Sequence, residues 1–384
     1  MSRDVARPSW LLLGAVTALG PLAMGVHVPG LGEIAAAMGE PVSRTQLSVP
    51  AFIFAFGFGM FGAGDIVDRV GLRRALVGGL LTFSLGALIA GLMTGMSSLL
   101  IGRVLMGVGA AFAIVVPRVA VASDVAQTTH GLARLAAIQS AVPALAPLLG
   151  AALVAWLGWR ATFLLPAAVA VALIVVTTGV LPKQAAARVP VTRPSSSSAR
   201  LLSRGWLLPT VEIALVTAVF LVLLAQTSNL LVRPFDLDAA EVGLVLAVTG
   251  AAFVVGSIAL VRAKEPAPLQ RAARIAFIGS MVLLAVGSSS LLVWAMGLFV
   301  YALANGVLVP ASFGAVALAV PASKGRALGT AGAIQMLVGA AAGAAANALG
   351  GLTPHTFGAG GAVVALTVLA LASIHPRLRR ASAT

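Results

Sequence analysis

The sequence predicts an all-α integral membrane protein with twelve transmembrane helices in two pseudo-symmetric six-helix bundles. Three observations carry this prediction. The 384 residues are 60 % hydrophobic and only 9 % charged, whereas a soluble domain is about 25 % charged. The apolar residues gather in runs of about 20, long enough to cross a bilayer as helices. A Pro/Ser-rich basic segment interrupts the chain near its middle.

Helices are the expected element of each run, because a backbone in hydrocarbon must satisfy its polar groups within the segment. Frequent Gly and Pro inside the runs fit membrane helices, where small residues let backbones approach closely. The first run is longer than the hydrophobic region of a signal peptide, so we interpret it as a retained helix. The predicted spans are 10–29, 46–64, 75–94, 98–118, 133–156, 160–181, 206–230, 241–261, 273–290, 292–318, 327–348 and 356–374.

The basic residues are distributed unevenly between the two sides that these spans define. With both termini in the cytoplasm, 21 of the 25 Lys and Arg residues fall in cytoplasmic segments, and the others are Arg44, Arg103, Arg160 and Arg233. This bias is the positive-inside rule. It explains the net charge of +14 without nucleic-acid binding, since no groove-sized basic patch exists. We expect a multi-pass protein of a plasma membrane. Its composition, rich in Ala, Gly and Arg and poor in Lys, suggests a bacterial source.

Residues 182–205 are basic, carry no acid and are rich in Pro and Ser, which is typical of a flexible cytoplasmic linker. They divide the chain into an N-terminal bundle (1–181) and a C-terminal bundle (206–384). WLLL and WLLP, and likewise AIQS and AIQM, recur at one common offset between the halves, which suggests duplication. Six-helix halves of this kind are a transporter architecture with substrate held near the midplane.

A short charged segment, GDIVDRVGLRR (64–74), lies between spans 2 and 3. We expect a cytoplasmic loop here. Gly64 and Gly71 would allow a tight reversal and close helix approach. The arginines would hold the loop on the cytoplasmic side, and ion pairs or helix N-termini would offset the charges of Asp65 and Asp68.

This segment resembles the loop motif G-x-x-x-D-R-x-G-x-R-R of the major facilitator superfamily. The matching residues are Gly64, Asp68, Arg69, Gly71, Arg73 and Arg74. The resemblance implies the major facilitator fold and a latch between the two halves on the cytoplasmic side. PRVAVASD, with Arg118 and Asp124, and HVPGLGEIAAAMG after span 1 resemble the Bcr/CflA-type drug exporters. We add Arg118 and Asp124 to the expected gating residues.

Two further segments resemble motifs of proton-coupled drug antiporters. IGRVLMGVGAA matches R-x-x-x-G-x-G in span 4 through Arg103, Gly107 and Gly109. An arginine inside a span usually faces a cavity or a carboxylate; the alternative is an arginine that reaches the outer interface. PALAPLLGA matches G-P-x-x-G-G in span 5 through Pro147 and Gly150, with Ala146 and Ala151 in place of two glycines. An ordinary small-residue packing seam is the alternative there.

One departure concerns the proton site. The exporters often carry an acid in span 1 just before a proline, but here GVHVP has Gly25, His27 and Pro29. Glu212 is the only acid clearly inside a span, and a carboxyl group in a low-dielectric environment can exchange a proton near neutral pH. The proton-coupling candidates are therefore Glu212, Arg103 and His27. The alternatives are an interfacial acid for Glu212 and a packing role for His27.

A drug-sized site should be mostly apolar with a few polar groups. In the resembled family, spans 1, 2, 4, 5, 7, 8, 10 and 11 line the cavity. The Phe, Met, Tyr and amide residues of those spans are Phe52, Phe56, Met60, Met106, Phe112, Gln139, Gln226, Asn229, Tyr301, Asn305, Phe313, Gln335 and Met336. Lipid or helix packing is the alternative for the apolar residues, and interhelical hydrogen bonding for the amides.

These observations favour a secondary transporter that exports drugs, antibiotics or other small, largely apolar compounds in exchange for protons. An importer of a small metabolite is the alternative, and a membrane sensor would require a soluble domain that the sequence lacks. We expect no enzymatic activity, no metal and no cofactor, with the proton gradient as the energy source. The expected partners are a small-molecule substrate and the lipid bilayer, and the expected state is a monomer.

Overall fold

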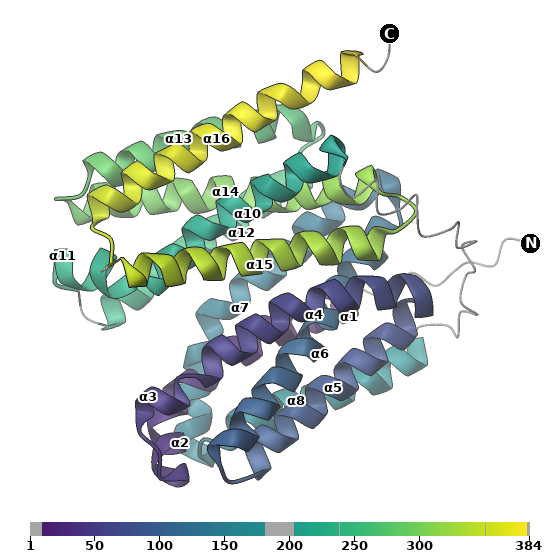
Figure 1. The fold of residues 1–384 in the computed structure, drawn as a ribbon, viewed down its shortest axis with the longest axis vertical. Coiled ribbons are helices and arrows are strands. Elements are labelled where there is room, and N and C mark those ends of the chain that lie inside the picture. The colour runs from purple at the N-terminus through teal and green to yellow at the C-terminus, as the bar shows by residue number, and fades with distance from the viewer. Residues whose placement is uncertain (1–9, 181–202, 238, 350, 382–384) are drawn as a thin grey trace, which may run out of the picture. The chain divides into compact units, whose positions relative to one another are not determined.

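The computed structural model describes residues 10–180, 203–237, 239–349 and 351–381. Within these ranges the chain forms helices joined by short connections, without a β-strand. Figure 1 shows them in chain order. The helices are α1 (Trp10–Gly25), η1 (Val28–Gly30), α2 (Leu31–Met38), α3 (Val42–Thr45), α4 (Ser48–Val70), α5 (Leu72–Leu92), α6 (Met96–Ala122), η2 (Val125–Gln127), α7 (Thr128–Leu157), α8 (Ala161–Val180), α10 (Arg204–Ala225), η3 (Ser228–Val232), α11 (Arg233–Phe235), α12 (Ala239–Arg262), α13 (Pro266–Val286), α14 (Leu291–Ala319), α15 (Lys324–Ala348) and α16 (Pro354–Ala381).

Membrane-crossing length is reached by eleven helices or helix runs of the described residues, and a twelfth span results when the bent α7 is counted as one. The two parts of α7 meet at 41°, and Pro143 and Pro147 lie inside this helix. Proline removes a backbone donor and bends a helix. The predicted all-α membrane fold with twelve spans is confirmed.

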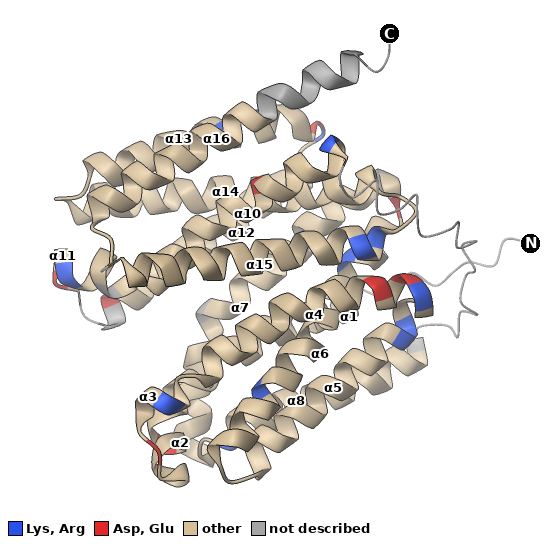
Figure 2. Cartoon of the chain, in the orientation of Figure 1, with Lys and Arg blue, Asp and Glu red and all other residues tan. Residues whose placement is uncertain are grey.

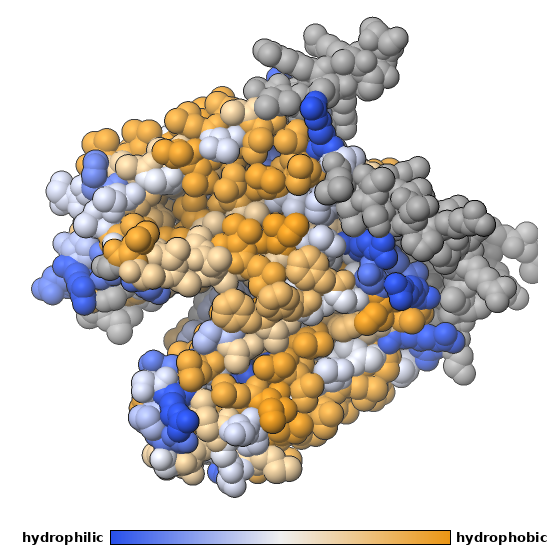
Figure 3. Space-filling model, viewed as in Figure 1, coloured by the Kyte–Doolittle hydropathy of each residue, from blue (hydrophilic) through white to orange (hydrophobic). Residues whose placement is uncertain are grey.

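The surface of the helices is that of a protein in lipid. Charged residues lie mainly near helix ends and most helix middles carry none (Figure 2). Apolar surface covers the flanks of the helices (Figure 3). On α5, Leu81, Leu85, Leu88 and Leu92 are all exposed. Their helical spacing forms one apolar stripe, as expected of a face in contact with acyl chains.

Contacts between Cα atoms divide the chain into two compact units. Unit 1 comprises Met1–Ser123, Ala141–Thr192 and Ala322–Ala333, and unit 2 comprises Asp124–Ser140, Arg193–Pro321 and Ile334–Thr384. The first turns of α15 therefore belong to unit 1, and the first half of α7 belongs to unit 2. Most of the predicted linker lies outside the described residues, so the boundaries at 182–205 stay a prediction.

The same packing device occurs in both units. In unit 1, a side chain at Gly107 of α6 would approach the Phe52 carbonyl oxygen of α4 within 2.5 Å. In unit 2, a side chain at Gly306 of α14 would overlap the Phe253 carbonyl oxygen of α12. Glycine lets these backbones touch. Spans 2 and 4, and spans 8 and 10, are thus joined in the same way, which agrees with the pseudo-symmetry predicted from the sequence repeats.

The charged segment 64–74 differs from the predicted loop. Helix α4 continues through Asp65 and Asp68 to Val70, and α5 begins at Leu72. The connection is Gly71 alone, with φ 84°, a conformation that glycine adopts without strain. The prediction of a loop was wrong because the acids of this segment have partners on another helix.

Candidate functional site

The acids of α4 bind the first turn of α15 inside unit 1. Asp68 accepts hydrogen bonds from the backbone N–H groups of Gly325 (2.9 Å) and Arg326 (2.8 Å). These N–H groups have no partner within their own helix, and the positive end of the helix dipole favours a carboxylate there. Asp68 therefore caps a helix that lies more than 250 residues away in sequence.

Asp65 adds an ion pair to the same contact. Arg326 Nε lies 2.5 Å from Asp65 Oδ1. A side chain at Gly64 would collide with the Gly325 backbone, and one at Gly325 would collide with Gly64 and with Asp68. The two glycines are thus what allows α4 and α15 to approach closely enough for the carboxylates to reach. We call Gly64, Asp65, Asp68, Gly325 and Arg326 the clasp.

Lysine extends the clasp to α6. Lys324 Nζ donates a hydrogen bond to the Ala122 carbonyl oxygen, at the last residue of α6. A cation at a helix C-terminus is stabilised by the unpaired carbonyl groups and the dipole. The start of α15 is therefore held by α4 on one side and by α6 on the other. Sequence reasoning missed Lys324, Gly325 and Arg326, which carry no motif of their own.

The remaining gating residues have separate positions. Arg73 Nη2 donates to the Thr178 carbonyl oxygen near the end of α8, and Arg69 and Arg74 are exposed. Arg118 is buried in α6, where its Nη1 would lie 3.3 Å from a side chain at Gly332. Asp124 follows the end of α6, and its carbonyl oxygen accepts a hydrogen bond from Thr128.

Arg103 lies fully buried in unit 1 and binds the end of α1. Its Nη1 donates to the Ala23 carbonyl oxygen (2.8 Å) and its Nε to the Ser48 carbonyl oxygen (3.0 Å). The Phe52 ring lies below the guanidinium, with 4.4 Å from Cζ to the ring centroid. The contacts thus join α1, α4 and α6 and leave Nη2 without a hydrogen-bond partner among the described residues. Arg103 does not reach the outer interface.

His27 lies close to this arginine, just after the end of α1. Its Nε2 is 3.2 Å from the Ser48 hydroxyl, and its ring is 5.7 Å from the Phe163 ring. The side chain is 0 % exposed, and Nδ1 has no hydrogen-bond partner among the described residues. Ser48 therefore connects the two proton-coupling candidates of unit 1, through its hydroxyl to His27 and through its carbonyl to Arg103.

The span-5 motif packs against the same point of span 1. A side chain at Gly150 of α7 would overlap the Val26 carbonyl oxygen. A side chain at Gly25 would lie 3.1 Å from the Ala146 Cβ and 3.7 Å from the Pro147 ring. We call the segment 23–27, where α1 ends, the span-1 break. Arg103 on one side and the small residues of α7 on the other converge on it.

Glu212 lies in unit 2 and is part of an ion pair. Arg274 of α13 binds both carboxylate oxygens, with Nε–Oε1 of 2.7 Å and Nη2–Oε2 of 3.0 Å, and the Ser312 hydroxyl of α14 donates to Oε2 at 2.9 Å. We call Glu212, Arg274 and Ser312 the Glu212 cluster. Sequence reasoning counted Arg274 among the basic residues of the cytoplasmic loop between spans 8 and 9, but it lies inside α13. The signal that could have found it is a lone arginine near the start of an apolar run, which needs an intramembrane acid.

The predicted cavity residues of unit 1 are all buried. Phe52 stacks on Phe56 with ring centroids 6.0 Å apart, and Met60 packs against the backbone of α15 at Gly329 and Gly332. The buried set is Phe52, Phe56, Met60, Met106 and Phe112.

Two amides of unit 2 belong to hydrogen-bond networks that reach α10. Asn305 donates to the Tyr301 hydroxyl (3.2 Å), which donates to the Val216 carbonyl oxygen (2.9 Å). Gln335 donates to the Thr217 hydroxyl (2.9 Å). The buried amide oxygens of Asn305 and Gln335 have no partner among the described residues. Each of these two oxygens therefore keeps an unused acceptor position.

Other amides have structural partners. Gln226 donates to Asn347 and accepts from Asn229 (2.8 Å) and from the Leu352 N–H (3.1 Å). This network closes one end of α10 against α15, so the alternative of interhelical hydrogen bonding fits Gln226 and Asn229 better than a cavity role. Phe313 is buried, while Gln139 and Met336 are partly exposed.

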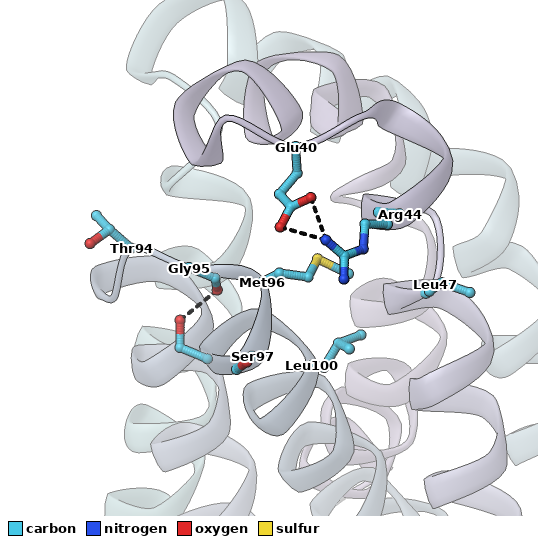
Figure 4. A pocket seen from close by; sticks show the side chains of 9 residues that line it. Glu40, Arg44, Leu47, Thr94, Gly95, Met96, Ser97 and Leu100 are labelled. Atoms are coloured by element: carbon cyan, nitrogen blue, oxygen red, sulfur yellow. Dashed lines mark hydrogen bonds and ion pairs between the residues drawn. The ribbon is translucent and has the colours of Figure 1, made fainter.

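A recess of about 500 Å³ in unit 1 lies outside all of these positions. Figure 4 shows the Glu40–Arg44 ion pair (2.8 Å) on one side and the first turn of α6, from Met96, on the other. None of the predicted site residues lines it. Its charged groups, Glu40 and Arg44, pair with each other, and the Ser98 hydroxyl donates to the Gly95 carbonyl oxygen, so we assign no substrate site to it.

Comparison with curated proteins finds resistance proteins. A chloramphenicol resistance protein of Pseudomonas aeruginosa is 31 % identical over 159 residues, which cover 40 % of this chain and 37 % of that protein. The multidrug resistance protein MdtL of Escherichia coli is 24 % identical over 282 residues, 72 % of each chain. The matched segment is thus little more than a third of the first relative and almost three quarters of the second.

Solved structures and a family model identify the fold and the family. The human organic anion transporter MFSD10 (TETRAN) superposes with a TM-score of 0.73 at 19 % identity, covering 94 % of this chain and 98 % of that chain. FucP, in the outward conformation, superposes with a TM-score of 0.74 at 15 % identity, covering 96 % and 98 %. The Major Facilitator Superfamily model matches residues 13–344. Because this match extends over most of the chain, the protein is a multi-pass membrane transporter that belongs to the Major Facilitator Superfamily.

Proposed function

We propose that the protein exports drugs, antibiotics or other small, largely apolar compounds in exchange for protons. It would work as a monomer in a bacterial inner membrane, with both termini in the cytoplasm and the proton gradient as its only energy source. No cofactor is required by this mechanism. The relatives named for chloramphenicol and multidrug resistance support export as the direction of transport.

The span-1 break is the observation that carries this proposal. The residues that resemble drug antiporters, Arg103 of α6 and Pro147 and Gly150 of α7, lie far apart in sequence. In the structure they meet the same few residues, from Ala23 to Val26. The resemblance therefore corresponds to one spatial feature and not to scattered matches in an Ala/Gly-rich chain.

The buried residues of each unit suit a largely apolar solute. Unit 1 presents Phe and Met side chains, which adapt to varied shapes. Unit 2 adds Tyr301, Asn305 and Gln335, whose free amide oxygens could accept a hydrogen bond from a solute hydroxyl or amide. Few charged side chains accompany them, so a highly charged metabolite is a poorer fit.

Alternating access requires contacts that form in one state and break in the other. The clasp is suited to this role, because carboxylates of α4 hold α15 by a few polar bonds at its first turn. We propose that the clasp stabilises the outward-facing state and opens when the cytoplasmic side opens.

The test is accumulation of labelled antibiotics and lipophilic cations in a pump-deficient bacterial host with and without the chain. Proton-driven export predicts lower accumulation, which recovers when a protonophore is added. Asp68→Asn, shown by immunoblot to reach the membrane, is the matched variant and should export more slowly. Unchanged accumulation over a broad panel would refute export, and protonophore-sensitive uptake of a metabolite would instead establish the importer.

A further inference from the structure

The Glu212 cluster joins three helices of unit 2 through one carboxylate. Arg274 of α13 binds it by two parallel hydrogen bonds, and Ser312 of α14 adds a third. The side chains of Glu212 and Arg274 are 9 % and 16 % exposed. Such bidentate pairs have a fixed geometry. The position of the Arg274 guanidinium therefore decides whether the Glu212 carboxylate accepts its two hydrogen bonds.

The three residues lie at one depth in the helices. Glu212 is eight residues after Arg204, where α10 begins, and Arg274 is eight residues after Pro266, where α13 begins. Ser312 is seven residues before the end of α14. At 1.5 Å per residue this places the cluster about 12 Å from the helix ends that we predict to be cytoplasmic. The long Arg274 side chain can reach toward those ends, as membrane arginines do.

Stability alone does not explain a pair in this position. Replacement of a buried ion pair by apolar residues is often neutral or favourable, whereas loss of one partner strands a charge. Ionisable residues within spans are rare and usually mark ion or proton pathways.

The other titratable side chains that the structure describes on α14 and α16 have partners elsewhere. Tyr301 of α14 bonds to the Val216 carbonyl oxygen, and His355 of α16 bonds to the Ala285 carbonyl oxygen. On α13 itself, Arg271 is exposed. Among the described residues, the charged group placed against Glu212 by an ion pair is therefore Arg274.

We propose that the Glu212 cluster is a proton-binding site in which Arg274 is the positioning residue. With Arg274 in place, Glu212 is ionised and carries no proton. When Arg274 turns toward the helix ends, Oε1 loses its donor and takes one proton from water, while Ser312 keeps its bond to Oε2. When Arg274 returns, that proton passes back to water. This inference rests on the proposed proton-driven transport, to which it adds Arg274 and Ser312.

Removal of both charges, that of Glu212 and that of Arg274, should affect transport differently if the pair is a proton site than if it is a structural ion pair. The variants are Glu212→Gln, Arg274→Gln and the charge-neutral double variant, in the full chain reconstituted in liposomes. Arg271→Gln, which removes an exposed charge from the same helix, is the matched control. Two transport modes are measured with a substrate found in the accumulation screen: counterflow, which needs no net proton movement, and uptake driven by a pH gradient.

We expect the double variant to remain folded and to keep counterflow within about two-fold of the parent, with gradient-driven transport reduced by about ten-fold or more. Arg271→Gln should keep both modes. Gradient-driven transport at the parent rate in the double variant would overturn the proposal, because the pair would then be structural. Loss of both modes in a folded double variant would overturn it too, because the cluster would then act in substrate passage.

Infrared difference spectroscopy of the reconstituted protein provides a readout that needs no substrate. We expect a carboxylic-acid band that appears as the pH is lowered, is absent in Glu212→Gln and has its midpoint displaced in Arg274→Gln. Absence of such a band in the parent would refute the proton site even if export is observed. A titrating band without export would support the proton site but refute the proposed export function. Failure of the proton site and failure of the proposed function therefore give different results.

Discussion

Asp68→Asn tests the clasp in the state that the structure describes. The carboxylate accepts two backbone hydrogen bonds from the N-terminus of α15, and asparagine retains one acceptor oxygen without the charge. A hydrogen bond to a charged group contributes about 1.5–3 kcal/mol, and a carboxylate at a helix N-terminus about 0.3–1 kcal/mol. Because Asp68 is exposed and screened by solvent, we expect a net loss of about 1–2 kcal/mol, which shifts the open/closed equilibrium about 5- to 30-fold.

The assay uses the absence of cysteine from the chain. A single Ala331→Cys places a thiol on α15 at a position that is 0 % exposed. Opening of the clasp should expose it to a membrane-impermeant maleimide, so the labelling rate should rise about 5- to 30-fold in Asp68→Asn. Glu33→Gln, which removes an exposed acid from α2, is the control. A labelling rate in Asp68→Asn within about two-fold of the parent would refute the reasoning that Asp68 holds α15.

Three further predictions concern unit 1. Arg103→Leu should lower the free energy of unfolding by about 2–5 kcal/mol, because two buried carbonyl oxygens lose their donor; an unchanged melting temperature in detergent would contradict this. Lys324→Gln should raise the labelling rate of the Ala331 thiol about two- to five-fold through loss of the cap on α6, and no change would show that Asp68 acts alone. Gly25→Asp should lower the yield of folded protein, and Ala146→Gly should restore part of it, as judged by size-exclusion chromatography; equal yields of the single and double variants would argue against the contact.

The sequence predicted the membrane fold well because the bilayer imposes a strong pattern. Spans of apolar residues and the asymmetry of Lys and Arg are independent of packing details, so the twelve spans could be predicted directly from the sequence. The position at which span 2 ends could not be predicted in this way. The sequence predicted a loop for Asp65 and Asp68, because no nearby residue in the sequence explains why these acids should lie in a helix. Their partners, Gly325 and Arg326, come from a helix more than 250 residues later.

The proton-coupling candidates show a similar limit. Glu212 was found because it is a lone acid in an apolar run, but its environment depends on Arg274, which is 62 residues away. Arg274 read as a basic loop residue because it lies near the start of its span. Only the packing of α10, α13 and α14 brings the acid, the guanidinium and the Ser312 hydroxyl together. The sequence could name the acid but not the ion pair that it forms.

The two departures from the antiporter pattern form one structural feature. Gly25 stands where the exporters often carry an acid, and Ala146 stands where their motif has a glycine. In the structure these residues face each other, with only 3.1 Å between the Ala146 Cβ and the position of a side chain at Gly25. An acid at position 25 would have to displace Ala146, whereas glycine at position 146 would leave the Pro147 ring as its nearest neighbour at 3.7 Å. The space for an acid in span 1 has therefore been filled from α7, and this is why Ala146→Gly should rescue Gly25→Asp. The proposed proton exchange would therefore use another buried group, and the candidates are His27 beside Arg103 in unit 1 and Glu212 with Arg274 in unit 2.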